Sequence, residues 1–416
     1  MDAHRPVPAA FLTAMVVDTV GTGVWVTFAL LYFSEGRGLP LAATGAALSA
    51  GAVAALLLGG LAAGALADRL GAHRAAALGC AVRALAFPAY LGAAHPVAVG
   101  LVAFAVSLGE RFFWAAHGGL VASATSDDQG RRRMFALLNG LRTLGLGVGA
   151  LAVAVGAALS ERVGPAFWTA IPLLNAAVFA LVGLLFHRLG RRCPPAPPPP
   201  RSGGYRGVLA NRRFLAFTGT TSALTLASVA FDSILPLYLR WLSLPLWLPP
   251  MTYVLACALV PAFQPVALRW SGQRAPLRVM AQSAALLAVA LGGLALLARC
   301  GPGTAVPLLG AVVVLFALGQ ALFGAVALVV VLGFAGGSEL GRYGAAYQLV
   351  WGVATAIGPG VHTALFGISG AAPWLVLAIA LLGAATVYTR LDRSGRSAVP
   401  GRPERLVSGR RVGGGR

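Results

Sequence analysis

Six ionisable residues stand inside long apolar stretches of this sequence: Asp18, Arg83, Glu110, Arg111, Arg142 and Asp232. A charged side chain at the centre of a membrane costs about 2.5–3.5 kcal/mol on insertion scales, so each needs an ionic partner or a water-filled cavity. Acids in such places can take up and release protons, and arginines can pair with them or with anions. We therefore take all of them except Arg83 as candidates for proton coupling or for the lining of a substrate cavity.

Asp18 is the most central of these acids, and Gly21 and Gly23 follow it within about two turns. Small residues there could admit water, so we expect Asp18 to carry proton coupling, with an arginine such as Arg111 approaching it. A structural hydrogen bond to a neighbouring helix is the alternative role for Asp18.

The other candidates each leave an alternative open. Consecutive helical residues point about 100° apart, so Glu110 and Arg111 are expected to serve different partners. Glu110 could instead form a purely structural pair with Arg142. Asp232 comes late in its apolar stretch, where it could do no more than cap that part of a helix.

The sequence contains no motif typical of metal binding, disulfide bonding, nucleotide binding or nucleophilic catalysis. The histidines and the four cysteines show neither metal-ligand nor disulfide spacing. No phosphate-binding G-x-x-x-x-G-K-[ST] motif and no Ser-His-Asp arrangement occurs. We therefore expect no metal, no cofactor and no enzyme activity, with a proton gradient as the energy source.

The elements that must hold these residues are transmembrane helices. The 416 residues are 58% hydrophobic and 11% charged, whereas soluble domains carry about 25% charged residues. Apolar segments of about 18 residues or more recur along the chain, as membrane-spanning helices require. We count twelve, centred near residues 20, 52, 84, 108, 147, 177, 226, 257, 288, 318, 355 and 380.

The basic residues set the expected topology. The net charge is +20 and every basic residue other than histidine is Arg. Gaps on one side of the twelve segments hold 25 arginines and gaps on the other side hold four, which places both termini and the central linker in the cytoplasm by the positive-inside rule. We expect a monomer in the inner or plasma membrane that contacts the lipid bilayer and a small-molecule substrate, and no nucleic acid.

The chain divides into two halves of similar pattern. Residues 1–189 and 211–392 each hold six segments, 190–210 form a Pro/Arg-rich linker expected in polyproline II, and 393–416 form a basic tail expected to be disordered. "FALLYF" ends the first segment and "ILPLYL" ends the seventh, while Gly149 and Gly358 correspond at an offset of 209. Such echoes predict an all-α polytopic membrane protein with two pseudo-symmetric six-helix halves.

The loop "GALADRLGAHR" after the second segment places an acid, Asp68, where positive charge is expected. Its pattern G-x-L-A-D-R-x-G resembles the loop motif of the major facilitator superfamily, except that Ala72 replaces the usual first basic residue. The resemblance covers roughly residues 8–392 and implies that family's fold and alternating access. It also implies that the motif forms a conformational latch, in which the acid braces the start of the eleventh apolar segment, near residues 341–343. The latch residues are Gly64, Asp68, Arg69, Gly71, Arg74 and, at the start of the eleventh segment, Arg342.

Further positions resemble exporter members of the same family. The pattern D-x-x-G-x-G at Asp18 is of that kind. The fifth segment lacks the Gly-Pro of the exporter motif, and Gly358–Pro359–Gly360 stands instead in the eleventh segment. Arg111, in the fourth segment, matches the arginine that the family has at this place, but Ala115 and His117 replace the glycines that usually accompany it. We expect close helix packing at Gly145, Gly149, Gly358 and Pro359.

The sequence thus predicts a secondary transporter that exports small hydrophobic or amphipathic molecules in exchange for protons. An importer or uniporter of a sugar or metabolite is the alternative, and a polytopic receptor or enzyme a more distant one. A greasy substrate is suggested by aromatic residues in possible cavity positions: Trp25, Phe28, Phe112, Phe113, Trp114, Phe231 and Trp351.

Overall fold

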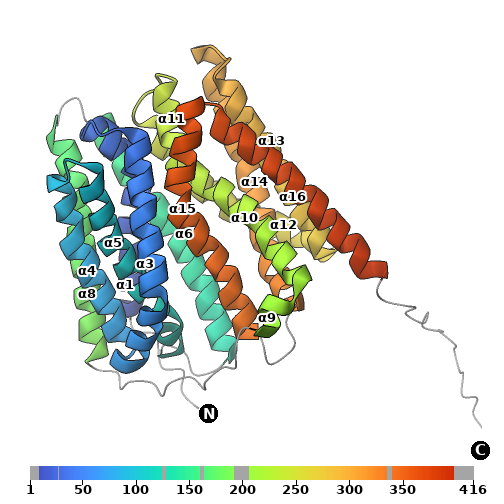
Figure 1. The fold of residues 1–416 in the computed structure, drawn as a ribbon, viewed down its shortest axis with the longest axis horizontal. Coiled ribbons are helices and arrows are strands. Elements are labelled where there is room, and N and C mark those ends of the chain that lie inside the picture. The colour runs from blue at the N-terminus through green and yellow to red at the C-terminus, as the bar shows by residue number, and fades with distance from the viewer. Residues whose placement is uncertain are drawn as a thin grey trace, which may run out of the picture.

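The computed structural model describes residues 9–26, 28–123, 128–159, 164–191, 206–334 and 340–397, and every element in this part of the chain is helical (Figure 1). The first half contains α1 (Ala9–Val26), α2 (Ala29–Leu31), the π-helix η1 (Tyr32–Gly36), α3 (Leu41–Leu70), α4 (Ala72–Ala86), the 3₁₀-helix η2 (Phe87–Gly92), α5 (Pro96–Ser123), α6 (Asp128–Ala158) and α8 (Ala166–Gly190). The second half contains α9 (Arg206–Ala210), α10 (Arg212–Ser233), α11 (Leu235–Trp241), α12 (Leu248–Gly272), α13 (Pro276–Leu297), α14 (Pro302–Phe334), α15 (Leu340–Ile368) and α16 (Ala372–Ser397).

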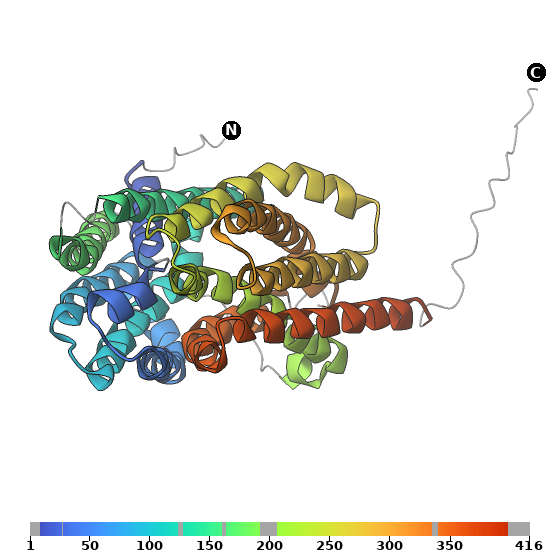
Figure 2. The ribbon, with the colours of Figure 1, turned by 90° about the horizontal axis from the view of Figure 1, so that it is seen from above.

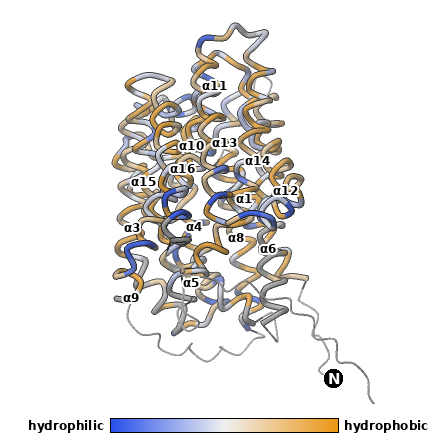
Figure 3. Tube along the Cα trace, turned by 90° about the vertical axis from the view of Figure 1, so that its right-hand side faces the viewer, coloured by the Kyte–Doolittle hydropathy of each residue, from blue (hydrophilic) through white to orange (hydrophobic). Residues whose placement is uncertain are grey.

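Twelve of these helices are long and apolar enough to cross a membrane, as the sequence predicts. Their backbone donors and acceptors pair within each helix, which is why helices can stand in lipid. Large apolar side chains such as Leu58, Leu85 and Ile379 are exposed on the outside of the bundle, and Figure 3 shows apolar residues along the length of the helices. This outer surface is suited to contact with lipid.

The spans form two bundles that follow each other along the chain. In the first, α4 packs against α5 and α8, and α1 packs against α6 and α8; in the second, α13 packs against α14 and α16, and α10 packs against α15 and α16. Figures 1 and 2 show the bundles side by side. Helix α3 packs on α15 and α6 packs on α12, so four helices carry most of the contact between the halves.

The predicted repeat is visible in equivalent contacts. The first span of each half ends early and continues as a short helix, α2 after α1 and α11 after α10, at the positions of the echoing "FALLYF" and "ILPLYL". Gly149 of α6 lies against Val20 of α1, and its counterpart Gly358 of α15 lies 2.6 Å, measured from an added Cβ, from Val229 of α10. Gly358 follows Gly149 by 209 residues, and Val229 follows Val20 by the same number. The equal offset supports a duplicated origin for this packing.

The two ends of the bundle differ in charge. We call the basic end the one at which α3 meets α4 beside Arg69 and Arg74, where α8 ends at Gly190 and α10 begins at Arg212. The opposite end carries η1 and α11, at the top of Figure 1.

The expected linker and tail differ from the structure at their borders. Helix α8 reaches Gly190, the short helix α9 occupies Arg206–Ala210, and α16 continues to Ser397 rather than ending near residue 392. The expected polyproline stretch at 194–200 and the residues after Ser397 lie outside the described part of the chain.

Candidate functional site: charged groups between the helices

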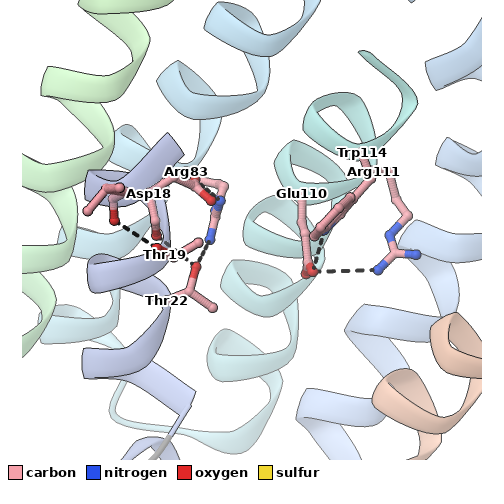
Figure 4. A network of polar contacts seen from close by, with 8 residues as sticks. Asp18, Thr19, Thr22, Arg83, Glu110, Arg111 and Trp114 are labelled. Carbon is pink, nitrogen blue, oxygen red and sulfur yellow. Dashed lines mark hydrogen bonds and ion pairs between the residues drawn. The ribbon is translucent and has the colours of Figure 1, made fainter. Parts of the chain in front are cut away.

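Asp18 and Arg83 form a buried ion pair between α1 and α4. Nη1 of Arg83 donates to Oδ1 of Asp18 at 3.0 Å, and the two side chains are only 7% and 8% exposed (Figure 4). Asp18 is the one fully buried acid among the residues whose side chains are described. Its partner is therefore Arg83, the intramembrane arginine left out of the predicted site, and not Arg111.

Arg83 is held by more than its charge. Its Cζ lies 3.5 Å from the centre of the Phe179 ring on α8, and Nη2 donates to Oγ1 of Thr22 at 3.4 Å. The Nε atom is buried and has no hydrogen-bond partner among the described residues. A guanidinium with one strong ionic partner depends on that carboxylate remaining charged.

Glu110 and Arg111 form a second, separate group on α5. Nη2 of Arg111 lies 3.8 Å from Oε1 of Glu110, and the same oxygen accepts a hydrogen bond from Nε1 of Trp114 at 3.3 Å. Figure 4 shows this group apart from the Asp18–Arg83 pair, with Arg111 pointing away from it. The two neighbours thus contact each other, and the alternative Glu110–Arg142 pair is not formed among the described side chains.

Arg111 extends from the first half to the second. It passes beside Gly59 of α3, and its Nη1 lies 3.2 Å from the position that a Cβ on Gly352 of α15 would occupy. The absent side chain at Gly352 leaves room for the guanidinium next to the backbone of α15. Arg111 therefore stands at the boundary where the two halves meet, which is where a residue that senses their movement would be placed.

Arg142 and Asp232 lie on the two sides of this boundary, on α6 and α10. The Arg142 side chain is exposed, and its Cζ lies 5.3 Å from the centre of the Trp114 ring. Asp232 is half-buried and makes no hydrogen bond with the described residues. Helix α11 follows after a break at Ile234, and no side chain, Asp232 included, caps its start.

The loop motif is described in part. Gly71 is the single residue between α3 and α4, and its φ of 81° is strained for residues other than glycine. Arg69 and Arg74 are exposed at the basic end, as topological anchors are expected to be. The side chains of Asp68 and Arg342 and the surroundings of Gly64 lie outside the described part, so the contact between Asp68 and helix α15 stays a prediction.

The glycines chosen for close packing do lie at close contacts. A Cβ on Gly145 would overlap Oγ1 of Thr19, and one on Gly149 would lie 2.7 Å from the backbone nitrogen of Val24, both on α1. The carbonyl of Pro359 accepts from Oγ1 of Thr363 at 2.7 Å and lies next to Gly45 of α3. These contacts bring α6 close to α1 and α15 close to α3.

One ion pair between the halves was not among the predicted residues. Nε of Arg240 on α11 donates to Oε1 of Glu35 in η1 at 3.0 Å, at the opposite end of the bundle. In the sequence, Arg240 stands out only as one of the four arginines on the less basic side of the spans. The echo between the two first spans could have revealed the pair, because Glu35 and Arg240 follow the echoing segments by nearly the same distance.

Three of the seven aromatic residues expected to line a cavity are packed in the protein interior. Phe28, Phe113 and Phe231 are 1%, 1% and 2% exposed, and Phe231 stacks on Phe316 inside the second half. Trp25 stacks on Tyr90 within an aromatic cluster of the first half. Trp114, at 39% exposure, is the expected cavity aromatic with the largest open surface that the structure describes. The hydrophobic substrate stays a prediction.

The described residues contain no group of three or more His, Cys, Asp or Glu side chains arranged to hold a metal ion. The described charges instead form one buried ion pair and one group at the boundary, while Arg142 and Asp232 make no ion pair within the described part of the chain.

Comparison with solved structures gives the same fold at low sequence identity. A variant of the nucleoside transporter NupG has a TM-score of 0.74 and 15% identity, covering 92% of this chain and 98% of that one. An auto-inhibited POT family peptide transporter gives 0.73 and 15%, covering 95% and 98%. A bacterial homologue of the iron transporter ferroportin, in an inward-facing state, gives 0.73 and 16%, covering 94% and 99%. No curated sequence matches significantly.

The family comparison reaches most of the chain. The model of the Major Facilitator Superfamily matches residues 10–306, which include all of the first half and the second half as far as the start of α14. With its twelve spans and its transporter neighbours, this chain belongs to the Major Facilitator Superfamily of membrane transporters.

Proposed function

We propose that this chain is a proton-coupled secondary transporter of small amphipathic molecules, with Asp18 as the group that takes up and releases the proton. The observation that carries the proposal is the buried Asp18–Arg83 pair, in which a single acid neutralises an arginine in the middle of two spans. Removing one partner of a buried pair leaves an uncompensated charge, which costs about 3–5 kcal/mol in proteins. Protonation of Asp18 has the same effect on Arg83.

A route leads from Asp18 to the boundary between the halves. Thr19 follows Asp18 and lies in contact with Gly145 of α6, and Gly147 on the same helix lies 3.1 Å, measured from an added Cβ, from Cys257 of α12 in the other half. A change in how α1 sits against α4 is therefore passed through α6 to the second half. This connection supports coupling between the charge of Asp18 and the arrangement of the halves.

The contacts between the halves support a conformation closed at the opposite end. Glu35–Arg240 and Ser49–Gly360 lie toward that end, and Arg111–Gly352 lies near the middle of the spans. If the positive-inside topology holds, these contacts close the side of the protein away from the cytoplasm. We propose that export against protons is the direction of coupling, in line with the resemblance of the Asp18 pattern to exporters.

Spectroscopy can test the role of Asp18 without a known substrate. Spin labels at Arg191 and Gln273, exposed residues of the two halves at the basic end, report the separation of the halves in a background free of native cysteines. The distance distribution should change between mildly acidic and mildly alkaline pH in the unsubstituted protein, because protonation of Asp18 removes the charge that pairs with Arg83. It should become independent of pH in Asp18→Asn and in Asp18→Asn/Arg83→Gln, and stay dependent in the control Glu110→Gln. Persistence of the change in Asp18→Asn would overturn the assignment.

The direction of coupling needs a second measurement. Liposomes that contain the protein and a pH-sensitive dye are exposed to amphipathic compounds added outside. Loss of internal protons when a compound enters indicates exchange, and a gain indicates symport, the mode of an importer. A pH change in neither direction, with compound uptake retained, would remove protons from the mechanism.

A further inference from the structure

An open groove runs between α4 and α8 on the outside of the first bundle. Its volume is about 620 Å³, within the range of about 300–1,000 Å³ that is usual for sites that bind small molecules. Small residues line its floor, among them Ala77 and Ala81 of α4 and Gly183 of α8. A Cβ on Gly183 would lie 3.3 Å from Cβ of Cys80 and 3.4 Å from the carbonyl oxygen of Ala77. The two helices therefore touch along this floor, and their small side chains leave the space above it free.

The walls of the groove are apolar and face the surroundings of the bundle. Leu78 and Leu85 of α4 and Leu184 of α8 line it, and all three are exposed, Leu85 to 80%. Helices α4 and α8 pack on each other and on other helices of the first half, at the side of that bundle away from the second half (Figure 1). The groove is therefore separate from the contacts between the halves, and it opens toward the acyl chains of the membrane.

Basic side chains stand at one mouth of the groove, at the basic end of the bundle. Arg74 and His187 line this mouth, where the span of α4 begins and that of α8 ends, and Arg191 follows His187 by one turn. A Cβ on Gly190 would lie 3.7 Å from Cγ of Arg74, so the end of α8 lies directly beside that arginine. Arg74, His187 and Arg191 are exposed and form no ion pair within the described part of the chain. The mouth thus presents positive charge at the level of the lipid headgroups.

The length of the groove matches the depth of one membrane leaflet. From Arg74 to Leu85, α4 advances by eleven residues, or about 16 Å at about 1.5 Å per residue. The hydrocarbon core of a bilayer is about 30 Å thick, so each leaflet contributes about 15 Å. An acyl chain that starts at the level of Arg74 therefore reaches the other end of the groove, at Leu85.

We propose that this groove is a binding site for an anionic phospholipid from the leaflet at the basic end. The phosphate of the lipid pairs with Arg74 and His187 at the mouth, and Arg191 adds positive charge beside it. One acyl chain lies on the alanine and glycine floor between the leucine walls. The bound lipid contacts both helices and so stabilises the packing of α4 on α8. This site is distinct from the proposed proton site and requires no substrate.

Charge and shape together favour this occupant. Arginine binds phosphate through two parallel hydrogen bonds, and basic pockets between transmembrane helices on the cytoplasmic side bind anionic headgroups. A phospholipid with a choline headgroup also carries a phosphate, but its ammonium group brings a positive charge close to Arg74 and Arg191. A soluble anion would leave the apolar groove uncovered. An anionic phospholipid matches both the basic mouth and the apolar floor.

The site is tested by the thermal stability of the full-length protein, purified in detergent and supplied with defined lipids. Dioleoyl phosphatidylglycerol and dioleoyl phosphatidylcholine have the same acyl chains and differ in charge. At equal mole fraction, phosphatidylglycerol should raise the unfolding temperature more than phosphatidylcholine does. Glycerol 3-phosphate, which has the charge without the chains, should not stabilise the protein. Native mass spectrometry of the same samples should find phosphatidylglycerol retained on the protein in preference to phosphatidylcholine.

Two kinds of variant test the two parts of the site. Arg74→Gln/His187→Gln should raise the phosphatidylglycerol concentration for half-maximal stabilisation about tenfold or more, because hydrogen bonds to a charged group are lost. Ala81→Leu fills the floor at an exposed position and should weaken the stabilisation by both lipids. The matched controls are Arg269→Gln, at an exposed arginine in the last turn of α12, and Ala89→Leu, at an exposed alanine of η2 outside the groove. Neither control should change the response to either lipid.

Three results would overturn the proposal. Equal stabilisation by the two lipids would mean that the basic mouth does not select a charge. A loss of preference in Arg269→Gln as large as in Arg74→Gln/His187→Gln would assign the preference to the overall positive charge. Stabilisation by glycerol 3-phosphate as strong as that by phosphatidylglycerol would assign the mouth to a soluble anion. The charge variant and the groove variant change different helical positions, so the test remains decisive if one of them does not fold.

Discussion

Arg240 of α11 donates from Nε to both carboxylate oxygens of Glu35, at 3.0 Å and 3.4 Å, and so joins the second half to the first at the opposite end of the bundle. Its Nη1 also donates to the carbonyl of Leu244 at 2.8 Å, which holds the guanidinium in place. Both side chains of the pair are about a third exposed, at 31% and 32%. The contact joins parts of the chain that alternating access must separate.

Neutralising this pair should shift the protein away from the conformation closed at the opposite end. An exposed ion pair contributes about 0.2–1 kcal/mol, so Glu35→Gln or Arg240→Gln should change the ratio of the two conformations by up to about fivefold, and less at high salt. Spin-label distances across the opposite end measure the ratio. The swap Glu35→Arg/Arg240→Glu should restore part of it, and Arg278→Gln, within one half, should have no effect; equal shifts in all variants would assign the change to general destabilisation.

Replacement by alanine should affect the stability of the protein differently at two glycines of α6. Gly145→Ala forces a methyl group against Thr19 of α1 and should destabilise the protein by about 1–3 kcal/mol, as overpacking does. Gly140 has no atom within 4 Å of an added Cβ, so Gly140→Ala should be neutral or stabilise by about 0.5–1 kcal/mol. Thermal unfolding in detergent measures both, and a loss of stability in Gly140→Ala as large as in Gly145→Ala would contradict the close contact.

The turn at Gly71 makes a separate prediction about the motif. Its φ of 81° with a ψ of 153° lies in a region that glycine alone adopts readily, so Gly71→Ala and Gly71→Asn should each cost about 1–3 kcal/mol in stability. Unfolding temperatures of the two variants give the comparison. Gly38 also has a positive φ, of 65°, but an added Cβ would have no atom within 4 Å. The loss of stability in Gly38→Ala therefore measures the effect of backbone strain alone, without contacts to neighbouring helices.

The orientation in the membrane is tested by labelling from outside the cell. Single cysteines at Gln273 and Gly301 stand in successive connections of the second half, before α13 and after it. The arginine distribution predicts that a membrane-impermeant thiol reagent labels Gly301→Cys in intact cells and Gln273→Cys only after the membrane is opened. The reverse order would invert the topology and the direction proposed for transport.

The sequence predicts well what depends on one helix or one turn. The twelve spans follow from apolar length, the close contacts at Gly145 and Gly358 follow from small residues, and Gly71 follows from the need to reverse the chain. Spans and turns are set by local composition and geometry, whereas the small residues indicate only that a helix packs closely there, and not that the contacts are with Thr19 and Val229.

The partners of the charges could not be predicted in the same way. Arg83 meets Asp18 across 65 residues, and Arg240 meets Glu35 across 205. Which arginine reaches which acid depends on how each helix is rotated against its neighbours, and composition alone does not fix that rotation. The partners Glu35 and Arg240 could have been suggested by the sequence repeat, because each follows the echoing end of the first span of its half.

The contact between α3 and α15 lies toward one end of these long helices, so a small tilt about it displaces the other end by a larger distance. The backbone nitrogen of Gly360 donates to Oγ of Ser49 at 2.7 Å, and Gly45 lies against Thr363 one turn farther toward the opposite end. From Ser49 to Leu70 at the basic end, α3 extends by roughly 30 Å at about 1.5 Å per residue. If the halves rock about this fulcrum, a tilt of about 10° moves the far end by about 5 Å while the pivot residues hardly shift. The small residues that form this contact toward the opposite end thus determine how far the helices move at the basic end.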